Sequence, residues 1–318
     1  MLNFLYCCDE NYNLQFQTSI FSLLENVSDE IRVYVLHKSG FRKEYISKKI
    51  VNHKNLNNIK FIEFTSHVDK FPNIKDSHVS EATYYRLFID EHINENLDIL
   101  IYLDADVICI EDPLIQLSEH IERLIGNDYI VSVTTEKAIT DGQERLGMKS
   151  EKYFNAGVMI IDYKKWINDG IGKKLRKKLI ENKMSLNFWD QDILNMFFDG
   201  SYLELDHELN SRAVLDQGEE IINEKNIDKY YLNKKLIHYQ GKLKPWSLKG
   251  ILNTKAKPYH EYFEIISNGD IHLQYNWKGN VVKDLINSLL TLNIFSHKKP
   301  FRLLIKVIKS LLRKNEKY

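Results

Sequence analysis

Two aspartates follow an apolar run near residue 100. The run reads Ile99-Leu-Ile-Tyr-Leu-Asp104-Ala-Asp106, and its β-rich, apolar composition predicts a buried strand that ends at the acidic pair. In open α/β sheets, ligands bind just outside the carboxyl ends of the strands. Burying two carboxylates together without a cation is costly. The position of Asp104 and Asp106 therefore indicates a divalent metal site, and a loop with helix-capping aspartates is the alternative.

A histidine, a glycine and a lysine lie close together much later in the chain, in the segment His238-Tyr-Gln-Gly241-Lys-Leu-Lys244-Pro-Trp246. An imidazole can complete a site of two carboxylates, and mixed nitrogen and oxygen ligation favours Mn²⁺ over Mg²⁺. Gly241 would let the backbone approach a phosphate, and Lys244 would neutralise it. A single histidine in a loop is more often structural, so both interpretations stay open.

Two shorter segments carry side chains that could bind a ligand. Asn155 and Ala156 are small residues at the start of a predicted strand, where they permit close approach of a ligand, and the asparagine offers both a donor and an acceptor. Asp190-Gln191-Asp192 begins a predicted helix. The alternatives are a tight turn for the first segment and a helix cap for the second.

The elements around these segments alternate between strands and helices. Strands are predicted at residues 2–8, 31–37, 59–64, 98–103, 129–134 and 156–162. Helices are predicted at residues 14–26, 41–52, 81–92, 163–183, 190–198 and 258–268 and at the C-terminus. The β-α-β-α-β order at the start predicts a parallel sheet covered by helices, and the polar segment 65–80 is expected to be a loop.

The composition excludes several classes of protein. The chain has 318 residues, of which 43% are hydrophobic and 28% charged, as in ordinary globular proteins. The 44 basic and 44 acidic residues cancel, which disfavours a nucleic-acid binder. Three cysteines are too few for a disulfide framework and fit a reducing compartment. Without a leader or a run of 18 apolar residues, we expect a cytoplasmic protein.

The C-terminal tail differs in charge from the rest of the chain. Residues 297–318 contain eight basic residues and one acidic residue, a net charge of +7, and the preceding residues therefore carry −7. Four basic residues form a stripe along the predicted helix: Arg302, Lys306, Lys309 and Arg313. The opposite side of the helix is apolar and consists of Phe301, Leu304, Ile308, Leu311 and Leu312. This pattern predicts an amphipathic helix that lies on an anionic membrane surface. The alternative is a helix docked on its own domain.

Taken in order, the segments above resemble glycosyltransferase family 8, the retaining sugar transferases that include bacterial lipooligosaccharide galactosyltransferases and glycogenin. The resemblance covers about residues 2–250. The matching segments are Asp9-Glu-Asn11-Tyr12, Thr83-Tyr-Tyr-Arg86-Leu, Tyr102-Leu-Asp104-Ala-Asp106, Phe154-Asn155-Ala156-Gly157, Asp190-Gln191-Asp192-Ile-Leu-Asn195 and His238-Tyr-Gln-Gly241-x-x-Lys244-Pro-Trp246.

The resemblance implies an α/β protein with the GT-A fold. A Rossmann-like mixed sheet flanked by helices would occupy residues 1–250, and a helical C-terminal extension with the basic tail would occupy residues 251–318. The implied reaction moves glucose or galactose from UDP-glucose or UDP-galactose to a glycan, lipid-linked or glycoprotein acceptor. The tail also resembles the membrane-associating tails of bacterial members, which implies a peripheral position on the inner face of the cell membrane.

The resemblance also implies roles for individual residues. Mn²⁺, with Mg²⁺ as the alternative, would be held by Asp104, Asp106 and His238. The nucleotide, donor sugar and diphosphate would be bound by Asp9, Asn11, Tyr12, Arg86, Ala105, Asn155, Ala156, Gly241 and Lys244. Gln191 would lie beneath the anomeric carbon, and Asp190 would bind sugar hydroxyls or act as a nucleophile. Gln240 departs from some relatives, which carry Cys there, so the acceptor is left open.

Three other functions compete with this interpretation. A haloacid-dehalogenase-type phosphohydrolase also places Asp-x-Asp after an apolar strand, but it would leave Asn155 and His238 unexplained. A nucleotidyltransferase of the same fold usually begins with a Gly- and Arg-rich loop, and residues 6–13 contain neither residue type. A binding module without catalysis is disfavoured because Asp104, Asp106 and His238 are all present.

Overall fold

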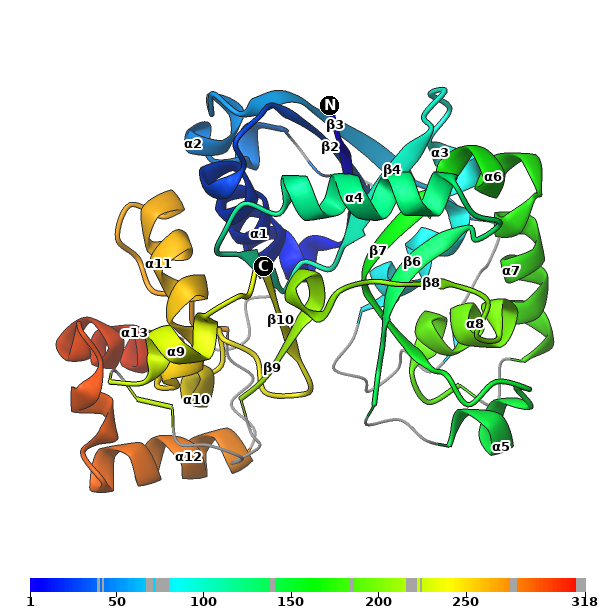
Figure 1. Ribbon diagram of the computed structural model, residues 1–318. Helices are drawn as coiled ribbons and strands as arrows, with labels where there is room; N and C mark the ends of the chain where they lie inside the picture. Colours follow the sequence, from blue (N-terminus) through cyan, green and yellow to red (C-terminus); the bar gives the residue numbers. More distant parts are fainter. Residues whose placement is uncertain are drawn as a thin grey trace.

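The computed structural model describes residues 1–38, 41, 43–66, 71–72, 80–137, 141–182, 186–215, 222–223, 225–274 and 279–312. Among these residues, strands form one large and one small sheet with helices packed around them (Figure 1). The seven-stranded sheet has the order β3-β2-β1-β4-β7-β6-β8, and the three-stranded sheet has the order β5-β10-β9. The strands are β1 Asn3–Cys8, β2 Ile31–Lys38, β3 Leu56–Phe64, β4 Ile99–Leu103, β5 Val107–Cys109, β6 Val131–Thr135, β7 Phe154–Asp162, β8 Leu203–Glu204, β9 Ser211–Val214 and β10 Leu236–Gln240.

The large sheet is mixed. Strands β1 to β4 pair in parallel, as the β-α-β-α-β order predicts, whereas β7 runs antiparallel to both β4 and β6. The α-helices are α1 Asn13–Asn26, α2 Lys48–Val51, α3 Ile89–His92, α4 Leu114–Ile125, α5 Gly142–Leu146, α6 Tyr163–Asn168, α7 Ile171–Glu181, α8 Trp189–Phe198, α9 Ile227–Tyr231, α10 Leu248–Ile251, α11 Lys257–Ile266, α12 Gly279–Leu290 and α13 Pro300–Leu312. The 3-10 helices are η1 Glu10–Tyr12, η2 Lys43–Tyr45, η3 Glu81–Phe88, η4 His207–Asn210, η5 Thr254–Ala256 and η6 Asn293–Ser296.

The large sheet is covered on both faces, which explains the continuous apolar runs of its strands. In β1, Leu5 and Cys7 face the hydrophobic cluster that includes η3, α6, α7 and α8. The alternate residues Phe4, Tyr6 and Cys8 face a second cluster that includes α1 and α4. Two-sided burial fixes the register of the strands, and it holds their carboxyl ends, where ligands bind, in a rigid frame.

The helices near the C-terminus gather at the end of the molecule opposite α7 and α8 (Figure 1). Helix α13 packs Leu303 and Val307 into an apolar cluster with Leu248, Ile251 and Ile271. None of the helices in the described part of the chain combines the length and the hydropathy that crossing a bilayer requires.

Several elements differ from the sequence predictions for local reasons. The predicted helix 81–92 is mostly the 3-10 helix η3, followed by α3. Within η3, the side chain of Arg86 donates to the carbonyl of Thr83 (3.2 Å). The predicted helix 163–183 breaks into α6 and α7 at Gly170, whose φ is 61°. Residue 183 and parts of the predicted loop 65–80 lie outside the described residues.

Other elements were only partly predicted or not predicted at all. The predicted helix 41–52 consists of η2 and α2, and residue 42 lies outside the described part. Helix α4 was not predicted, although Leu117, Ile121 and Leu124 recur on its buried face at helical spacing. The small sheet was not predicted either, because its strands have three to five residues each and show no clear alternation.

Candidate active site

Strand β4 and the small sheet together bring the two aspartates to a histidine from a distant part of the chain. The backbone N–H of Asp104 donates to the carbonyl of Gly157 on β7 (2.8 Å), which fixes the chain just after β4. The chain then enters β5, which pairs antiparallel with β10 so that His238 lies opposite Val107. His238 is therefore inside a strand, and the prediction of a loop at this position was wrong.

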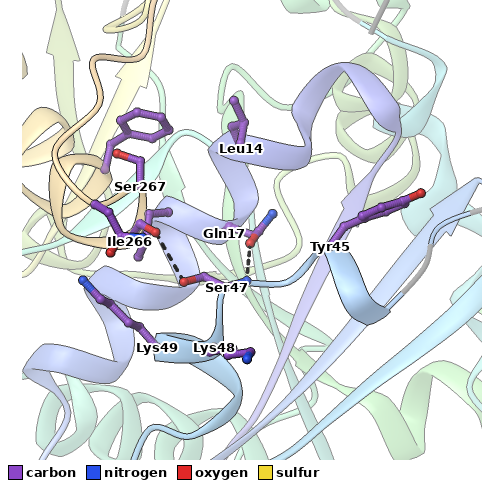
Figure 2. Close-up of a pocket in the computed structure, with 10 residues that line it drawn as sticks. Leu14, Gln17, Tyr45, Ser47, Lys48, Lys49, Ile266 and Ser267 are labelled. Atoms are coloured by element: carbon purple, nitrogen blue, oxygen red, sulfur yellow. Dashed lines mark hydrogen bonds between the residues drawn. The ribbon is translucent and has the colours of Figure 1, made fainter.

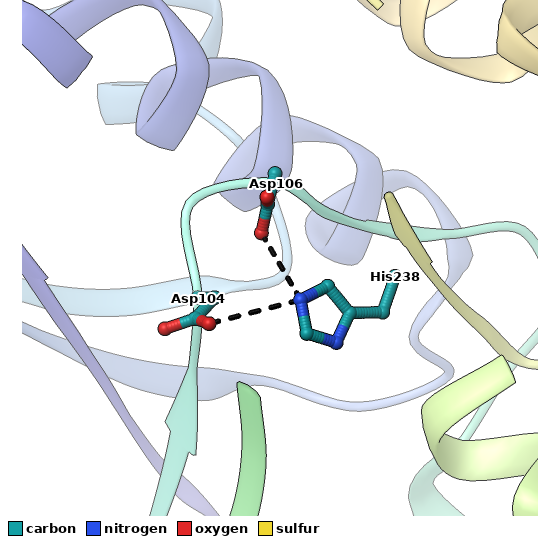
Figure 3. A group of neighbouring side chains, drawn as sticks. All are labelled: Asp104, Asp106 and His238. Atoms are coloured by element: carbon teal, nitrogen blue, oxygen red, sulfur yellow. Dashed lines mark ion pairs between the residues drawn. The ribbon is translucent and has the colours of Figure 1, made fainter. Parts of the chain in front are cut away.

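The three side chains converge on one point (Figure 3). Nε2 of His238 lies 3.4 Å from Oδ1 of Asp106 and 3.7 Å from Oδ2 of Asp104. Each residue offers one ligand atom, and these atoms all lie within 4.8 Å of one another. Asp106 and His238 are buried, and Asp104 is half-buried. Two carboxylate oxygens and one imidazole nitrogen, gathered away from bulk water, fit a divalent cation.

Lys244 adds a positive charge beside this group. Its Nζ lies 2.6 Å from Oδ2 of Asp106 and donates to the carbonyl of Tyr239 (2.7 Å). Burial alone would raise the pKa of Asp106, but the positive charge of Lys244 and the neighbouring His238 outweigh burial and hold that pKa below its usual value. The carboxylate is therefore ionised, which is the form that a metal ligand requires.

Arg86 connects the end of β4 with the start of α8. Its Nη2 lies 3.3 Å from Oδ1 of Asp104, and its Nε lies 2.6 Å from Oδ2 of Asp190. The guanidinium also stacks on the ring of Tyr102 (4.1 Å) and donates to the carbonyl of Ala156. Burial raises the pKa of Asp190 to about 6, even though Arg86 and a hydrogen bond from Thr83 lower it. One buried cation thus links two carboxylates that come from different elements.

The remaining residues of the Asp190-Gln191-Asp192 segment face different partners. Oε1 of Gln191 accepts from the backbone N–H of Ala156 (3.0 Å), so its amide lies against the start of β7. Asp192 is fully buried and accepts two hydrogen bonds from Arg145 (2.7 and 3.0 Å). The two carboxylates of this second Asp-x-Asp triplet bind different arginines, Arg86 and Arg145, and neither belongs to the group of ligand atoms around His238.

The residues predicted to bind the nucleotide lie at the carboxyl end of β1, which is the neighbour of β4 in the sheet. Asp9 is buried and caps η1 by accepting from the backbone N–H of Asn11 (3.0 Å), and its burial raises its pKa. The ring of Tyr12 packs edge-on against Trp246 (6.0 Å). Since parallel strands end at the same edge of a sheet, these residues share the edge of the candidate metal site.

The other predicted residues surround the same point. Ala105 is buried between the two aspartates. Oδ1 of Asn155 accepts from the backbone N–H of Gly157 (3.0 Å), close to the amide of Ala156. Gly241 follows β10 with a φ of 85°, a conformation that favours glycine. The fold thus brings all the predicted segments to one edge of the large sheet.

A hollow outside this region has different properties. It measures about 390 Å³ and lies between α1, α2 and the end of α11 (Figure 2). The side chain of Gln17 there accepts from the backbone N–H of Ser47 (2.8 Å), and the hydroxyl of Ser47 donates to Ile266 (3.4 Å). These polar groups already have partners within the protein, so the hollow is a weaker candidate than the acidic group.

Comparison with known proteins assigns the family. The model of the family described as "Glycosyl transferase family 8" matches residues 3–250. The chain belongs to glycosyltransferase family 8. It is therefore a glycosyltransferase, and the match decides against the phosphohydrolase, the nucleotidyltransferase and the binding module.

Two curated relatives of this family 8 enzyme extend over most of its length. General stress protein A of Bacillus subtilis (strain 168) is 27% identical over 298 residues, which cover 88% of this chain and 96% of the relative. A lipopolysaccharide 1,2-glucosyltransferase of Escherichia coli (strain K12) is 30% identical over 259 residues, which cover 77% of this chain and 72% of the relative.

A solved structure confirms the fold of the enzyme. The galactosyltransferase LgtC, crystallised with donor and acceptor sugar analogues, is 24% identical with a TM-score of 0.67, and the likeness covers 83% of this chain and 96% of LgtC. The predicted GT-A fold, with a mixed sheet flanked by helices, is thereby confirmed.

Sequence analysis of the enzyme missed one buried side chain at the site. Asn210 is 3% exposed and ends η4 just before β9. Its amide lies between Asn155 and His238. The local sequence Leu-Asn-Ser carries no recognisable signal, because the asparagine acquires its partners only through the pairing of β9 with β10.

Proposed function

We propose that the enzyme is a retaining hexosyltransferase that moves glucose or galactose from a UDP-sugar to a glycan, lipid-linked or glycoprotein acceptor. The observation that carries the proposal is the convergence of Asp104, Asp106 and His238 beside Lys244. The names of the relatives, a lipopolysaccharide glucosyltransferase and a galactosyltransferase, support the two sugars and a glycan acceptor.

The proposed cofactor is Mn²⁺, held by Asp104, Asp106 and His238. The imidazole nitrogen in the ligand set favours Mn²⁺ over Mg²⁺. When bound, the metal supplies Lewis-acid stabilisation of negative charge on the departing diphosphate. Lys244 would add a second positive charge, and the backbone at Gly241 would approach the phosphates closely because it has no side chain there.

The other predicted residues would bind and orient the donor. We assign Asp9, Asn11, Tyr12 and Ala105 to the nucleotide, since they lie at or beside the carboxyl end of β1 and β4. We assign Arg86, Asn155 and Ala156 to the ribose or donor sugar. The buried position of Arg86 and its ion pairs with Asp104 and Asp190 support a fixed geometry for these contacts.

Transfer with retention would proceed by attack of the acceptor on the same face as the leaving group. The bond between the anomeric carbon and the phosphate oxygen breaks, the bond to the acceptor oxygen forms, and the acceptor proton passes to the departing phosphate. The ion pair of Asp190 with Arg86 supports this route, because it lowers the nucleophilicity of the carboxylate. The amide dipole of Gln191 would stabilise the positively charged sugar. A covalent glycosyl adduct on Asp190, detected by mass spectrometry, would instead establish a double displacement.

The experiment is a donor screen that measures UDP release from UDP-glucose and UDP-galactose with Mn²⁺, Mg²⁺ or chelator. Water serves as the default acceptor, so the screen needs no knowledge of the natural one. We expect release from one of the two donors, with Mn²⁺ more effective than Mg²⁺, and none with chelator. Release that is independent of metal would contradict the proposed site, and release from neither donor would contradict the proposed sugars.

We also propose that the chain divides at residue 250 into a transferase domain, residues 1–250, and a helical extension, residues 251–318.

We further propose that residues 251–318 bring the enzyme to the inner face of an anionic membrane. Helix α13 is docked on its own domain through Leu303 and Val307, and yet Phe301, Ile305 and Ile308 are 71%, 53% and 53% exposed. The proposed helix is thus docked on its own domain by one side, and its exposed side is available to a membrane. The exposed apolar side chains and the charge of +7 in residues 297–318 fit a surface of anionic lipid.

Sedimentation with vesicles tests the membrane proposal. The double variant Ile305→Ser/Ile308→Ser should sediment less with vesicles of phosphatidylglycerol and phosphatidylcholine than the unchanged chain. Ile115→Ser is a matched control, because Ile115 is 72% exposed but lies on α4. Equal sedimentation of the double variant and the unchanged chain would contradict the proposal.

A further inference from the structure

A row of amides, of which Asn210 is buried and Asn155 half-buried, lies next to His238. The backbone N–H of Gly157 donates to Oδ1 of Asn155 (3.0 Å). Nδ2 of Asn210 donates to the same oxygen (3.1 Å), and Oδ1 of Asn210 lies 3.0 Å from Nδ1 of His238. Asn210 and His238 are only 3% and 4% exposed, so water has little access to these bonds.

The direction of this row follows from its first member. A backbone N–H can only donate, so the atom of Asn155 that faces Gly157 must be the amide oxygen. That oxygen can only accept hydrogen bonds, so the group of Asn210 that faces it must be the NH₂ group. The oxygen of Asn210 then faces His238, and the ring must carry a proton on Nδ1 to donate to it. In the neutral ring, the nitrogen without a proton is therefore Nε2, which faces Asp104 and Asp106.

We propose that Asn210 is a positioning residue that holds His238 in the Nδ1-protonated form, with the lone pair of Nε2 directed at the metal position. The inference rests on the proposed metal site. Histidine ligands of metals generally donate their other N–H to a fixed acceptor, which sets the orientation of the ring. Without Asn210, the carboxylates of Asp104 and Asp106 would attract the proton to Nε2, and a protonated Nε2 cannot bind a metal.

Two neighbours of the ring are consistent with this role. Gly157 leaves room for the ring, because a Cβ at that residue would lie 2.1 Å from Cε1 of His238. Nε2 of Gln240 lies 3.3 Å from Nδ1 of His238, and the two ends of this amide are interchangeable by rotation about its side chain. The amide can turn its oxygen toward the ring and act as a second acceptor, so it does not oppose a proton on Nδ1.

The experiment measures the protonation of the ring and the affinity for metal separately. Nitrogen-15 NMR of the metal-free protein, at a pH where the ring is neutral, reports which nitrogen of His238 carries the proton. Calorimetry with Mn²⁺ alone reports the affinity. Asn210→Leu should shift the proton to Nε2 and weaken Mn²⁺ binding by about 10- to 100-fold. Asn210→Asp retains an oxygen acceptor and should keep Nδ1 protonated, but it loses the donor to Asn155, so its Mn²⁺ affinity should lie between those of Asn210→Leu and the unchanged chain.

Matched variants separate positioning from stability. Asn55→Leu removes an amide that donates to Leu24 and Val27 (3.0 and 2.8 Å), away from the site, and should leave Mn²⁺ affinity unchanged. If Asn210→Leu does not fold, Asn210→Ala takes its place. A folded variant that keeps Nδ1 protonated and binds Mn²⁺ as tightly as the unchanged chain would overturn the proposal. Failure of the unchanged chain to bind Mn²⁺ would overturn the metal site itself, and the NMR comparison would still decide the role of Asn210.

Discussion

The candidate metal site and the C-terminal helices depart from the usual distribution of polar and apolar groups in opposite ways. At the site, Arg86, Asp106 and Asp190 are charged and buried. On α13, Phe301 and Ile305 are apolar and exposed. Each departure has a free-energy cost that a ligand can offset: a cation and a phosphate at the site, and a lipid surface at the helices. In both regions, groups whose placement costs free energy indicate the kind of partner that would bind there.

The largest expected effect tests the buried charges of the site directly. Asp104→Asn removes one negative ligand while it keeps the shape of the side chain. We expect UDP release with Mn²⁺ to fall by about a thousandfold or more, because charge stabilisation of the leaving group is lost. Thermal unfolding serves as the control for folding. Activity near that of the unchanged chain would remove Asp104 from the site.

The next effect is on stability and concerns the partner of Asp190. Arg86→Leu would leave that carboxylate buried and unpaired, so we expect the free energy of unfolding to fall by about 3–5 kcal/mol. The double variant Arg86→Leu/Asp190→Leu removes both charges and should recover part of this loss. Unfolding in urea measures both variants. A double variant less stable than Arg86→Leu would show that the buried ion pair is not the cause.

A smaller effect is the pH dependence of stability that two buried histidines, His260 and His272, should cause. Burial lowers the pKa of His272 to about 3 and that of His260 to about 4, so both rings are neutral in the folded protein. Below pH 6.5 the unfolded chain takes up protons that the folded chain does not. Stability therefore rises with pH in this window, and acid lowers it by about 2 kcal/mol per ring between pH 6.5 and pH 5.

Urea unfolding at pH 7 and pH 5 measures this pH dependence. The variant His272→Phe removes one of the two rings and retains an aromatic side chain next to Phe263, which stacks on His272 at 4.7 Å. The loss of stability between the two pH values should be smaller in the variant than in the unchanged chain. An equal loss in both proteins would exclude His272 as its source.

The smallest effect concerns the ion pairs that dock α13. Lys306 binds Asp270 at the surface, where their side chains are 29% and 57% exposed. Lys306→Gln should lower the free energy of unfolding by less than about 1 kcal/mol, because solvent screens such pairs. The same variant should weaken sedimentation with anionic vesicles, since it removes one positive charge from the proposed membrane surface. A large loss of stability would mean that the pair, and not the apolar contacts of Leu303 and Val307, holds the helix.

The family, the strands of the parallel half and the acidic pair at the end of β4 could be predicted from the amino-acid sequence. These features are local: a buried strand requires a continuous apolar run, and the residues next to it end up at its carboxyl end. Segments such as Asp9-Glu-Asn11-Tyr12 could be recognised because they resemble, in the same order along the chain, the motifs of glycosyltransferase family 8.

Contacts between residues far apart in the sequence could not be predicted and depend on the folded chain. The pairing of β5 with β10 brings His238 to Asp106, and the pairing of β9 with β10 brings Asn210 to His238. Arg86 reaches both Asp104 and Asp190 because η3, which carries it, packs against both β1 and α8. No local pattern encodes these contacts, since the hydrogen bonds and charges involved gain their strength only when the surrounding core has excluded water.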